Sequence, residues 1–393
     1  MRARTKVAVI GAGPAGLMLA HLLTRAGIET VMIERHSRSY VENRIRAGIL
    51  EHEVAALLRE TGVGARMDEV GFRHDGTNIL FDGVLHRLDF ASLGKHVMLY
   101  SQHEVVRDLI AARLAAGGEI LFEAEVTAIE NFNGSEPRVC FTYHGETREL
   151  DCEIIAACDG FHGIGRASLP ANLVREYDRE YPFGWLGILA EAPPSLDELI
   201  YANHDRGFAL LSMRSSSVSR LYLQCPLDTD LAEWPDSRIW DELSIRLAHP
   251  GFSLNTGAIF QKNITPMRSY VAEPMQSGRL FLAGDAAHIV PPTGAKGLNA
   301  AVADAVILAR AIIAQFLDDN PETLRCYTET CLARIWKIER FSWLMTSLLH
   351  RFDNHSAFDR RIQRAELDYY VNTPTGGTAL IENYVGLPIG AVP

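Results

Sequence analysis

The stretch Lys6-Val7-Ala8-Val9-Ile10-Gly11-Ala12-Gly13-Pro14-Ala15-Gly16 decides the fold of this chain. An apolar run enters a glycine turn with GxGxxG spacing, and a second apolar run ends in Glu34. Together they predict a dinucleotide-binding βαβ unit. Gly11 permits the tight turn, Gly13 lets the backbone approach a pyrophosphate, and Gly16 lets the helix lie close to the strand. The helix N-terminus offers free N–H groups to phosphate oxygens, and Glu34 offers acceptors to ribose hydroxyls.

Length and charge limit the class of protein. The chain has 393 residues, which allows two or three domains, and its 47% hydrophobic and 22% charged residues are ordinary for a globular protein. The net charge of −11 argues against a nucleic-acid partner, which requires a basic face. No run of about eighteen uncharged apolar residues occurs, so we expect no membrane partner. The basic and apolar start carries its glycines at motif spacing, which argues against a secretory signal.

The six cysteines form no CxxC pair and no metal-like cluster with histidine. We therefore expect reduced thiols, a cytoplasmic location and no metal site. Cys326 and Cys331 are five residues apart in a stretch with helical spacing. Such positions lie about 140° apart around a helix axis, so we expect no disulfide between them.

Apolar spacing and turn residues predict the organisation of the chain. Helices are expected at 51–60, 102–116, 297–316 and 321–352, and strands at 120–122, 126–129, 138–143, 152–156 and 279–283. Between them, the runs 181–185, 199–201, 208–212 and 219–224 have the character of a mostly antiparallel sheet. We divide the chain into a dinucleotide-binding part (1–172), an inserted sheet domain (173–268), and a third part (269–393) that completes the first domain and adds C-terminal helices.

Two further motifs follow predicted strands. Gly284-Asp285 precedes a glycine-rich segment and a helix start, where Asp285 is suited to accept hydrogen bonds from a polyol chain. Cys158-Asp159-Gly160 closes another strand. Taken singly, the first motif is also consistent with an Asp helix cap and the second with an ordinary loop.

The three motifs, in this order and spacing, resemble the flavin-dependent aromatic monooxygenases. Further segments carry the resemblance over nearly the whole chain, and they match the branch acting on 4-hydroxybenzoate: 44–48, 181–187, 199–204, 286–299 and 382–388. The resemblance implies an α/β fold, α+β overall, with a Rossmann-like FAD domain, an inserted antiparallel substrate sheet and a helical C-terminal region. It also implies a homodimer.

The implied reaction converts 4-hydroxybenzoate to 3,4-dihydroxybenzoate with NADPH and O2, through a flavin C4a-hydroperoxide, in aromatic-acid degradation. The resemblance assigns cofactor-binding positions for FAD, which are Gly11, Gly13, Ala15, Gly16, Glu34, Arg44, Arg46, Gln102, Asp159, Arg220, Asp285, Leu298 and Asn299. No second GxGxxG occurs, so the nicotinamide coenzyme has no domain of its own. The resemblance places it in a surface groove with Arg35, Tyr40, Arg46, His162 and Arg268.

The substrate positions make chemical sense. An aromatic acid needs a cation, and the planar fork of Arg214 matches a carboxylate, with Ser212 and Tyr222 as added hydroxyl donors. By resemblance, Tyr201 meets the substrate phenol and Tyr384 meets Tyr201. His74 then ends a proton path to solvent, and the carbonyl of Pro292 faces the phenol beside Thr293. A phenol with a pKa of about 10 needs such a relay to ionise near neutral pH.

Several alternatives stay open at this point. Read alone, Tyr201 is also consistent with a sheet-packing residue, His74 with a solvated loop histidine, and Arg214 with a polar hairpin. The same chemistry on 4-aminobenzoate or 3,4-dihydroxybenzoate fits the pattern, as does a non-catalytic FAD-binding sensor. An FAD disulfide reductase would need a second nucleotide motif and a cysteine pair, which the sequence lacks. The segment 35–38, with Arg35, His36 and Arg38, suits a 2′-phosphate and favours NADPH, while NADH remains possible.

Overall fold

The first sheet contains the glycine motif. The structure, a computed structural model, describes residues 3–389 except Ile45 and Ala47, two positions of the 44–48 segment that lie outside the described residues. The first sheet has the order β19-β20-β13-β2-β3-β9, and only β19 runs antiparallel to its neighbour. Its strands are β2 (Val7–Ile10), β3 (Thr30–Glu34), β9 (Glu119–Phe122), β13 (Ile154–Ala157), β19 (Gln276–Ser277) and β20 (Leu280–Leu282). Helix α1 (Pro14–Arg25) joins β2 to β3, as the motif predicts.

Close approach of backbone explains two of the motif glycines. Gly11 has φ +100°, a conformation that favours glycine, and an added Cβ there would lie 2.4 Å from the carbonyl oxygen of Cys158. An added Cβ at Gly16 would lie 2.1 Å from the Gly11 carbonyl oxygen. These two positions let α1 lie directly against the sheet.

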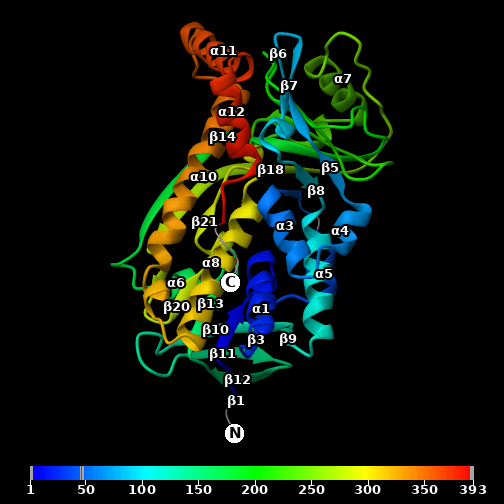
Figure 1. Cartoon of the computed structure of the whole chain (residues 1–393). Helices are drawn as coiled ribbons and strands as arrows, with labels where there is room; N and C mark the ends of the chain where they lie inside the picture. The colour runs from blue at the N-terminus through cyan, green and yellow to red at the C-terminus, as the bar shows by residue number, and fades with distance from the viewer. Residues whose placement is uncertain (1–2, 45, 47, 390–393) are drawn as a thin grey trace.

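Helix α8 (Gly297–Leu317) packs on α1 and completes this core (Figure 1). By length and composition alone it is apolar enough to cross a membrane, but 61% of that window is buried inside the fold. Such burial is expected of a core helix that is apolar all round.

The second sheet has the order β21-β18-β14-β17-β16-β15-β6-β7 and is antiparallel except for the pair β15–β6. Its strands are β6 (Gly76–Phe81), β7 (Val84–Asp89), β14 (Arg175–Glu191), β15 (Ile200–Ala202), β16 (Ala209–Met213), β17 (Ser219–Cys225), β18 (Ala258–Glu273) and β21 (His288–Ile289). The expected mostly antiparallel sheet is thus present. The segment 173–268 does not build it alone, because β6, β7 and β21 come from outside that segment.

Period-two alternation gives this sheet two different faces. Tyr201, Leu210 and Tyr222 belong to an aromatic-rich core on one face. Ile200 and Leu211, one position along their strands, pack on the other face against α7 (Asp236–Arg246), a helix that the sequence patterns did not predict. Tyr201 and Tyr222 therefore share one face, because both are paired with Leu210 across neighbouring strands.

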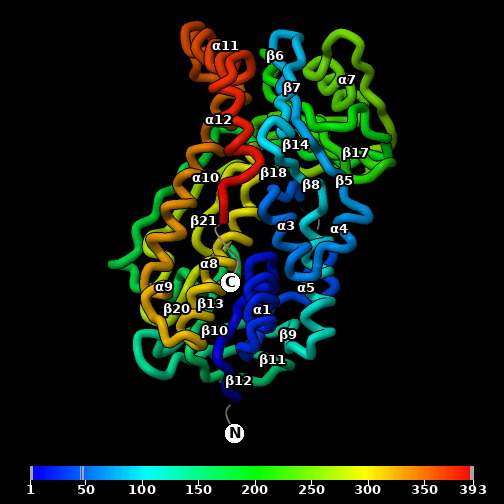
Figure 2. The backbone as a smooth tube through the Cα atoms, in the orientation of Figure 1, coloured from blue at the N-terminus to red at the C-terminus, as the bar shows by residue number. Residues whose placement is uncertain are grey.

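Helices enclose the outer surfaces (Figures 1 and 2). Predicted helices 51–60, 102–116 and 297–316 are confirmed by α3 (His52–Glu60), α5 (Gln102–Ala115) and α8. The expected helical stretch 321–352 divides into α9 (Glu322–Arg325) and α10 (Tyr327–Leu349). The remaining elements are α2 (Arg38–Asn43), α4 (Ala65–Val70), α6 (Ile164–Ala167), α11 (Ala357–Asn372) and α12 (Pro374–Val385), the small sheet of β4 (Ile49–Leu50), β8 (Val97–Leu99) and β5 (Phe72–His74), and the sheet of β1 (Ala3–Arg4), β12 (Glu146–Asp151), β11 (Arg138–Tyr143) and β10 (Ala124–Glu130).

All six cysteines are free thiols, as expected. Cys326 is the N-cap residue of α10, and Cys331 lies inside that helix. Burial raises the pKa of the Cys331 thiol well above its usual range, which makes this sulfur an apolar core atom rather than a reactive group.

A neutral histidine lies in the aromatic core behind the second sheet. The indole Nε1 of Trp185 donates a 2.7 Å hydrogen bond to His350 Nε2, and the imidazole stacks on Phe183 and Phe208. Burial lowers the pKa of His350 to about 3. The folded protein therefore keeps this ring uncharged at neutral pH.

We expect His350 to make the protein sensitive to acid. The unfolded chain binds a proton at His350 below about pH 6.5, whereas the folded chain does so only near pH 3. The contribution of this group to the free energy of unfolding is therefore fully present above pH 6.5 and is lost as the pH falls from 6.5 to 3. Lowering the pH to 5 should cost about 2 kcal/mol through this group. His350→Gln keeps an acceptor for Trp185 but does not titrate. Urea unfolding at pH 7 and pH 5 should show a smaller loss in the variant, and equal losses would contradict the assignment.

Candidate active site

One cavity of about 770 Å³ lies between the two sheets. This volume is in the usual range for ligand sites. Its walls come from the α1 turn, the end of β3, the segments 44–49 and 99–104, the inner face of the second sheet, and the segment 283–301. Most residues predicted from the sequence line it, including Gly11, Gly13, Ala15, Glu34, Arg35, Arg44, Arg46, Gln102, Asp159, Tyr201, Ser212, Arg214, Arg220, Tyr222, Asp285, Pro292 and Leu298.

The glycine turn forms one end of the cavity. Glu34, buried at the end of β3, accepts hydrogen bonds from the backbone N–H groups of Ala12 and His36, each 2.8 Å long. These bonds hold the carboxylate beside the turn. An added Cβ at Gly13 would meet no atom within 4 Å, so the space in front of this residue is open.

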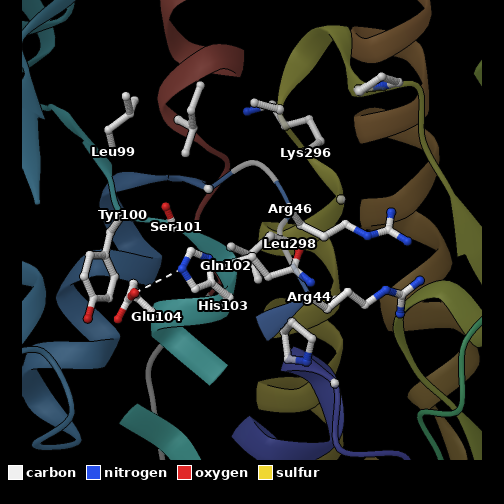
Figure 3. Close-up of a pocket in the computed structure, with 18 of the residues that line it drawn as sticks. Arg44, Arg46, Leu99, Tyr100, Ser101, Gln102, His103, Glu104, Lys296 and Leu298 are labelled. Carbon is white, nitrogen blue, oxygen red and sulfur yellow. Dashed lines mark ion pairs between the residues drawn. The ribbon is translucent and has the colours of Figure 1, made fainter. Parts of the chain in front are cut away.

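Two arginines from one segment line the middle of the cavity. Figure 3 shows Arg44 and Arg46 extending in the same direction, with Gln102 and Leu298 beside them. Burial lowers the pKa of Arg46, the charge of Arg44 lowers it further, and Asp285 opposes both effects. Two guanidinium groups side by side provide N–H donors and positive charge for an anionic group.

Asp159 and Asn299 are held by the protein itself. Asp159 lines the cavity; the backbone N–H of Gly165 donates to its Oδ2 at 2.8 Å, while its Oδ1 is buried without a partner among the described residues. The amide of Asn299 donates to the carbonyls of Ile49 and Ala295, and its oxygen accepts from Glu51 N–H. Asn299 does not line the cavity, and its side chain instead fixes the loop at 49–51.

The second sheet supplies the opposite wall. In the β16–β17 ladder, Leu210 pairs with Tyr222 and Ser212 pairs with Arg220, so all four side chains share the inner face. Arg214 follows directly after β16, and its backbone N–H donates to Val218 at 2.8 Å in the connecting turn. Alternation therefore brings the predicted serine, arginine and tyrosine together.

This wall is positively charged. Burial lowers the pKa of Arg214 to about 10, and the nearby Arg220 also lowers it, so Arg214 stays a cation at neutral pH. Arg220 lies over the ring of Tyr222, and its Nη1 is buried without a partner. Two close, partly desolvated guanidinium groups repel each other, and this arrangement favours the binding of an anion beside them.

A pair of tyrosines closes the cavity at its inner end. The hydroxyls of Tyr201 and Tyr384 are 2.9 Å apart, and both residues are buried. Burial raises the pKa of Tyr201 well above its usual value, and the neighbouring Tyr384 adds to this. Burial raises the pKa of Tyr384 to about 12, although hydrogen bonding to Tyr201 and Thr77 lowers it. Tyr201 lines the cavity, and Tyr384 lies behind it.

His74 is buried on β5, not solvated on a loop. Within the described part of the chain, neither ring nitrogen has a hydrogen-bond partner, so His74 is not hydrogen-bonded to Tyr384. Burial lowers the pKa of His74, and the nearby carboxylates of Glu198, Asp197 and Asp75 raise it.

The segment after β21 forms the floor. Pro292 lines the cavity, whereas Thr293 is fully buried and its hydroxyl accepts a hydrogen bond from Thr346. Lys296 also lines the cavity, and its buried ammonium donates to Glu51 at 2.6 Å and to the carbonyl of Tyr384 at 2.9 Å. The sequence patterns did not single out Lys296, although it lies within a quoted segment.

The residues expected to bind the nicotinamide coenzyme fall into separate groups. Arg35 and Arg46 line the cavity, and the half-exposed Tyr40 stacks on His36. The rings of His162 and Phe161 are 5.0 Å apart, and Arg268 lies 4.6 Å over Phe161 while it pairs with Asp178.

Other cavity residues escaped the sequence analysis. Trp185, His103 and Glu104 line the cavity together with Arg66. His103 directly follows Gln102 at the start of α5, so proximity to a predicted residue was the only signal for it. Within residues 3–389, apart from 45 and 47, no group of three or more His, Cys, Asp or Glu residues is arranged to hold a metal ion.

Comparison with known proteins identifies similar chains. A family described as FAD binding domain matches residues 4–342. The p-hydroxybenzoate hydroxylase of Acinetobacter baylyi is 49% identical over 388 residues, which is 98% of this chain and 96% of that protein. A putative FAD-dependent monooxygenase of Bacillus subtilis, YetM, is 26% identical over 85% of this chain and 91% of its own length.

Solved structures share the fold. The p-nitrophenol 4-monooxygenase PnpA of Pseudomonas putida superposes with a TM-score of 0.84 at 19% identity, covering 99% of this chain and all of that one. A probable FAD-dependent monooxygenase of Pseudomonas aeruginosa, pqsL, has a TM-score of 0.73 at 20% identity, covering 92% of this chain and 98% of that one.

The cavity fits FAD. The open space before Gly13 would accept a pyrophosphate, with the α1 N-terminus behind it. Asp159 and Arg220 both line the cavity, and each has one buried polar atom without a partner among the described residues.

We expect Gly13→Ala to separate ligand space from protein packing. The added methyl meets no protein atom, and the φ of −80° suits alanine, so the FAD-free protein should keep its free energy of unfolding within about 0.5 kcal/mol. The methyl should weaken FAD binding about tenfold or more, because it occupies the pyrophosphate space. Gly16→Ala is the matched control and should destabilise the FAD-free protein itself. Unchanged FAD affinity in Gly13→Ala, measured by fluorescence titration, would contradict this placement.

Proposed function

We propose a specific reaction for this chain, which belongs to the family of FAD-dependent aromatic monooxygenases. The proposed substrate is 4-hydroxybenzoate, and the proposed product is 3,4-dihydroxybenzoate. The enzyme hydroxylates an aromatic substrate with O2. The observation that carries the specific proposal is the arrangement of charges along the cavity. A cation, Arg214, lies on the same sheet face as the Tyr201–Tyr384 pair. A ring with a carboxylate at one end and a phenol at the other matches this arrangement.

The proposed orientation follows from hydrogen-bond chemistry. Arg214 would bind the carboxylate through two parallel N–H groups, and the hydroxyls of Ser212 and Tyr222 would donate to the same group. The phenol would then meet Tyr201 at the inner end, with the carbonyl of Pro292 facing it. This orientation is a proposal, and its support is that these residues line one cavity.

The proposed role of the tyrosines is to remove the phenol proton. The substrate O–H donates to Tyr201, and the Tyr201 hydroxyl donates to Tyr384 across the 2.9 Å bond. The buried His74, with two unpartnered ring nitrogens and acidic neighbours, would receive the proton and release it to solvent. Loss of the proton makes the ring carbon beside the oxygen electron-rich.

Bound FAD supplies the redox chemistry, because it takes electrons from a nicotinamide coenzyme and transfers one oxygen atom of O2. Glu34 and Arg44 would hold its ribose and pyrophosphate. Asp159, Asp285 and the start of α8 would line the ribityl chain and ring, with Arg220 near the ring. The wall residues would also exclude water from the reacting carbon.

We further propose that the chain divides at about 172 and 268, that it acts as a cytoplasmic homodimer, and that NADPH is the coenzyme. Arg35 lines the cavity and provides positive charge for a 2′-phosphate, with His36 beside it. Arg38 lies on the same exposed segment, where it pairs with Glu42 at 2.7 Å.

Tyr201→Phe tests the proposed reaction. The variant should bind FAD and 4-hydroxybenzoate, because Arg214 remains, but it should fail to ionise the bound phenol. NADPH oxidation should slow by about 100-fold, the usual scale for loss of a positioned acid–base group, and O2 should leave largely as peroxide. The measurement is the ultraviolet spectrum of bound substrate against pH, with product analysis. Tyr384→Phe should show a milder loss. The same phenolate band in wild type and Tyr201→Phe would show that Tyr201 only packs.

Coenzyme choice has its own test. We expect a higher kcat/KM with NADPH than with NADH. Replacing Arg35 and Arg38 together by Ser should narrow the difference, mainly by lowering the NADPH value by about tenfold, since each charge-assisted bond is worth about 1.5–3 kcal/mol when buried and less at a surface. A wild-type enzyme that uses NADH equally well would refute the proposal.

A further inference from the structure

His103 occupies a position next to the proposed carboxylate site. It is the second residue of α5, lines the cavity, and is mostly buried. Its Nδ1 lies 3.2 Å from Nη2 of Arg214. Its Nε2 lies 3.0 Å from Oε1 of Glu104, and Figure 3 shows this pair. No role in the proposed reaction has so far been given to this imidazole.

The two neighbours of His103 determine where its proton lies. A guanidinium has only N–H donors, so His103 Nδ1 must accept from Arg214. Nε2 therefore carries the hydrogen and donates it to the Glu104 carboxylate. Only the neutral imidazole satisfies both contacts. Burial and the charges of Arg214 and Arg107 lower the pKa of His103, which favours this neutral form over the opposing effect of Glu104.

Other side chains hold Glu104, the residue at the other end of this series of hydrogen bonds, in place. Glu104 accepts from Arg66 at 2.5 Å and from Arg107 at 2.9 Å. Arg66 also pairs with Asp108, which lies in α5 like Glu104. His103 is thus held by a carboxylate that two arginines keep in place.

Two contacts with described residues engage the Arg214 guanidinium, which lines the cavity. Nη1 donates to the carbonyl of Arg46 at 3.0 Å, and Nη2 faces His103. A guanidinium has five N–H donors, so with two engaged three remain for a ligand. A long arginine side chain loses rotamer freedom when it binds an anion, and prior fixation reduces that loss.

We propose that His103 is a positioning residue that orients the Arg214 guanidinium for an aromatic carboxylate, through the chain Glu104–His103–Arg214. The inference rests on the proposed function, since it requires a carboxylate at Arg214. His103 itself need not touch the substrate. Its effect should appear in the affinity for acids and not for neutral phenols.

Replacing His103 by Asn or by Leu provides a matched pair of variants, because Asn and Leu have nearly the same shape. Only Asn keeps an acceptor close to the position of His103 Nδ1. The FAD-loaded enzyme is titrated with 4-hydroxybenzoate and with the neutral 4-hydroxybenzamide. His103→Leu should weaken acid binding about fivefold to tenfold, the scale of one lost hydrogen bond. Affinity for the amide should stay unchanged, the loss should appear in KM more than in kcat, and His103→Asn should recover much of the acid affinity.

The outcomes distinguish this inference from the proposed function. If the wild type preferred the acid over the amide and His103→Leu kept that preference, the role of His103 would be overturned. Equal losses for acid and amide in His103→Leu would also overturn it, because they would indicate general damage to the pocket. If the wild-type enzyme bound the acid and the amide with equal affinity, and Arg214→Ala also bound the two with equal affinity, the proposed substrate site itself would be wrong.

Discussion

The buried ion pair between Lys296 and Glu51 connects the parts of the molecule that form the cavity. Both side chains are almost fully buried, and the ammonium also donates to the carbonyl of Tyr384. Three segments far apart in the sequence meet here: the loop before α3, the start of α8, and the end of α12. Removing one partner of such a pair leaves an uncompensated buried charge, which costs about 3–5 kcal/mol. The position of the tyrosine pair relative to the floor of the cavity therefore depends on this contact.

The charge of the cavity contrasts with that of the chain. The protein carries a net charge of −11, yet the cavity wall contains Arg35, Arg44, Arg46, Arg214 and Arg220 together with Lys296. Several of these groups have no carboxylate partner in direct contact, and burial lowers the pKa of Arg46, Arg214 and Lys296. A positive site within a negative molecule attracts anions locally and disfavours them elsewhere. Dinucleotides, nicotinamide coenzymes and aromatic acids are all anions.

Local patterns were sufficient to predict the glycine turn and much of the second sheet. Gly11 and Gly16 have short-range reasons for being glycine, and the alternation in β16 and β17 is visible in the residues themselves. Tyr201 and Tyr384 are 183 residues apart, so no local pattern indicates that they meet. Their hydrogen bond depends on how α12 docks on the sheet. Resemblance to a family supplied that pair. The hairpin β6–β7, the helix α7 and the contact of His103 with Arg214 were missed for the same reason, since each is decided by tertiary packing.

The position of α12 in the chain has a consequence for synthesis. A ribosome makes the glycine turn first and Tyr201 near the middle, whereas Tyr384 emerges only after α12 begins at Pro374. Until then Lys296 also lacks its carbonyl acceptor. A nascent chain can therefore complete its dinucleotide-binding sheet before it can assemble the tyrosine pair. The order of translation thus delays the assembly of this end of the cavity until α12 has docked.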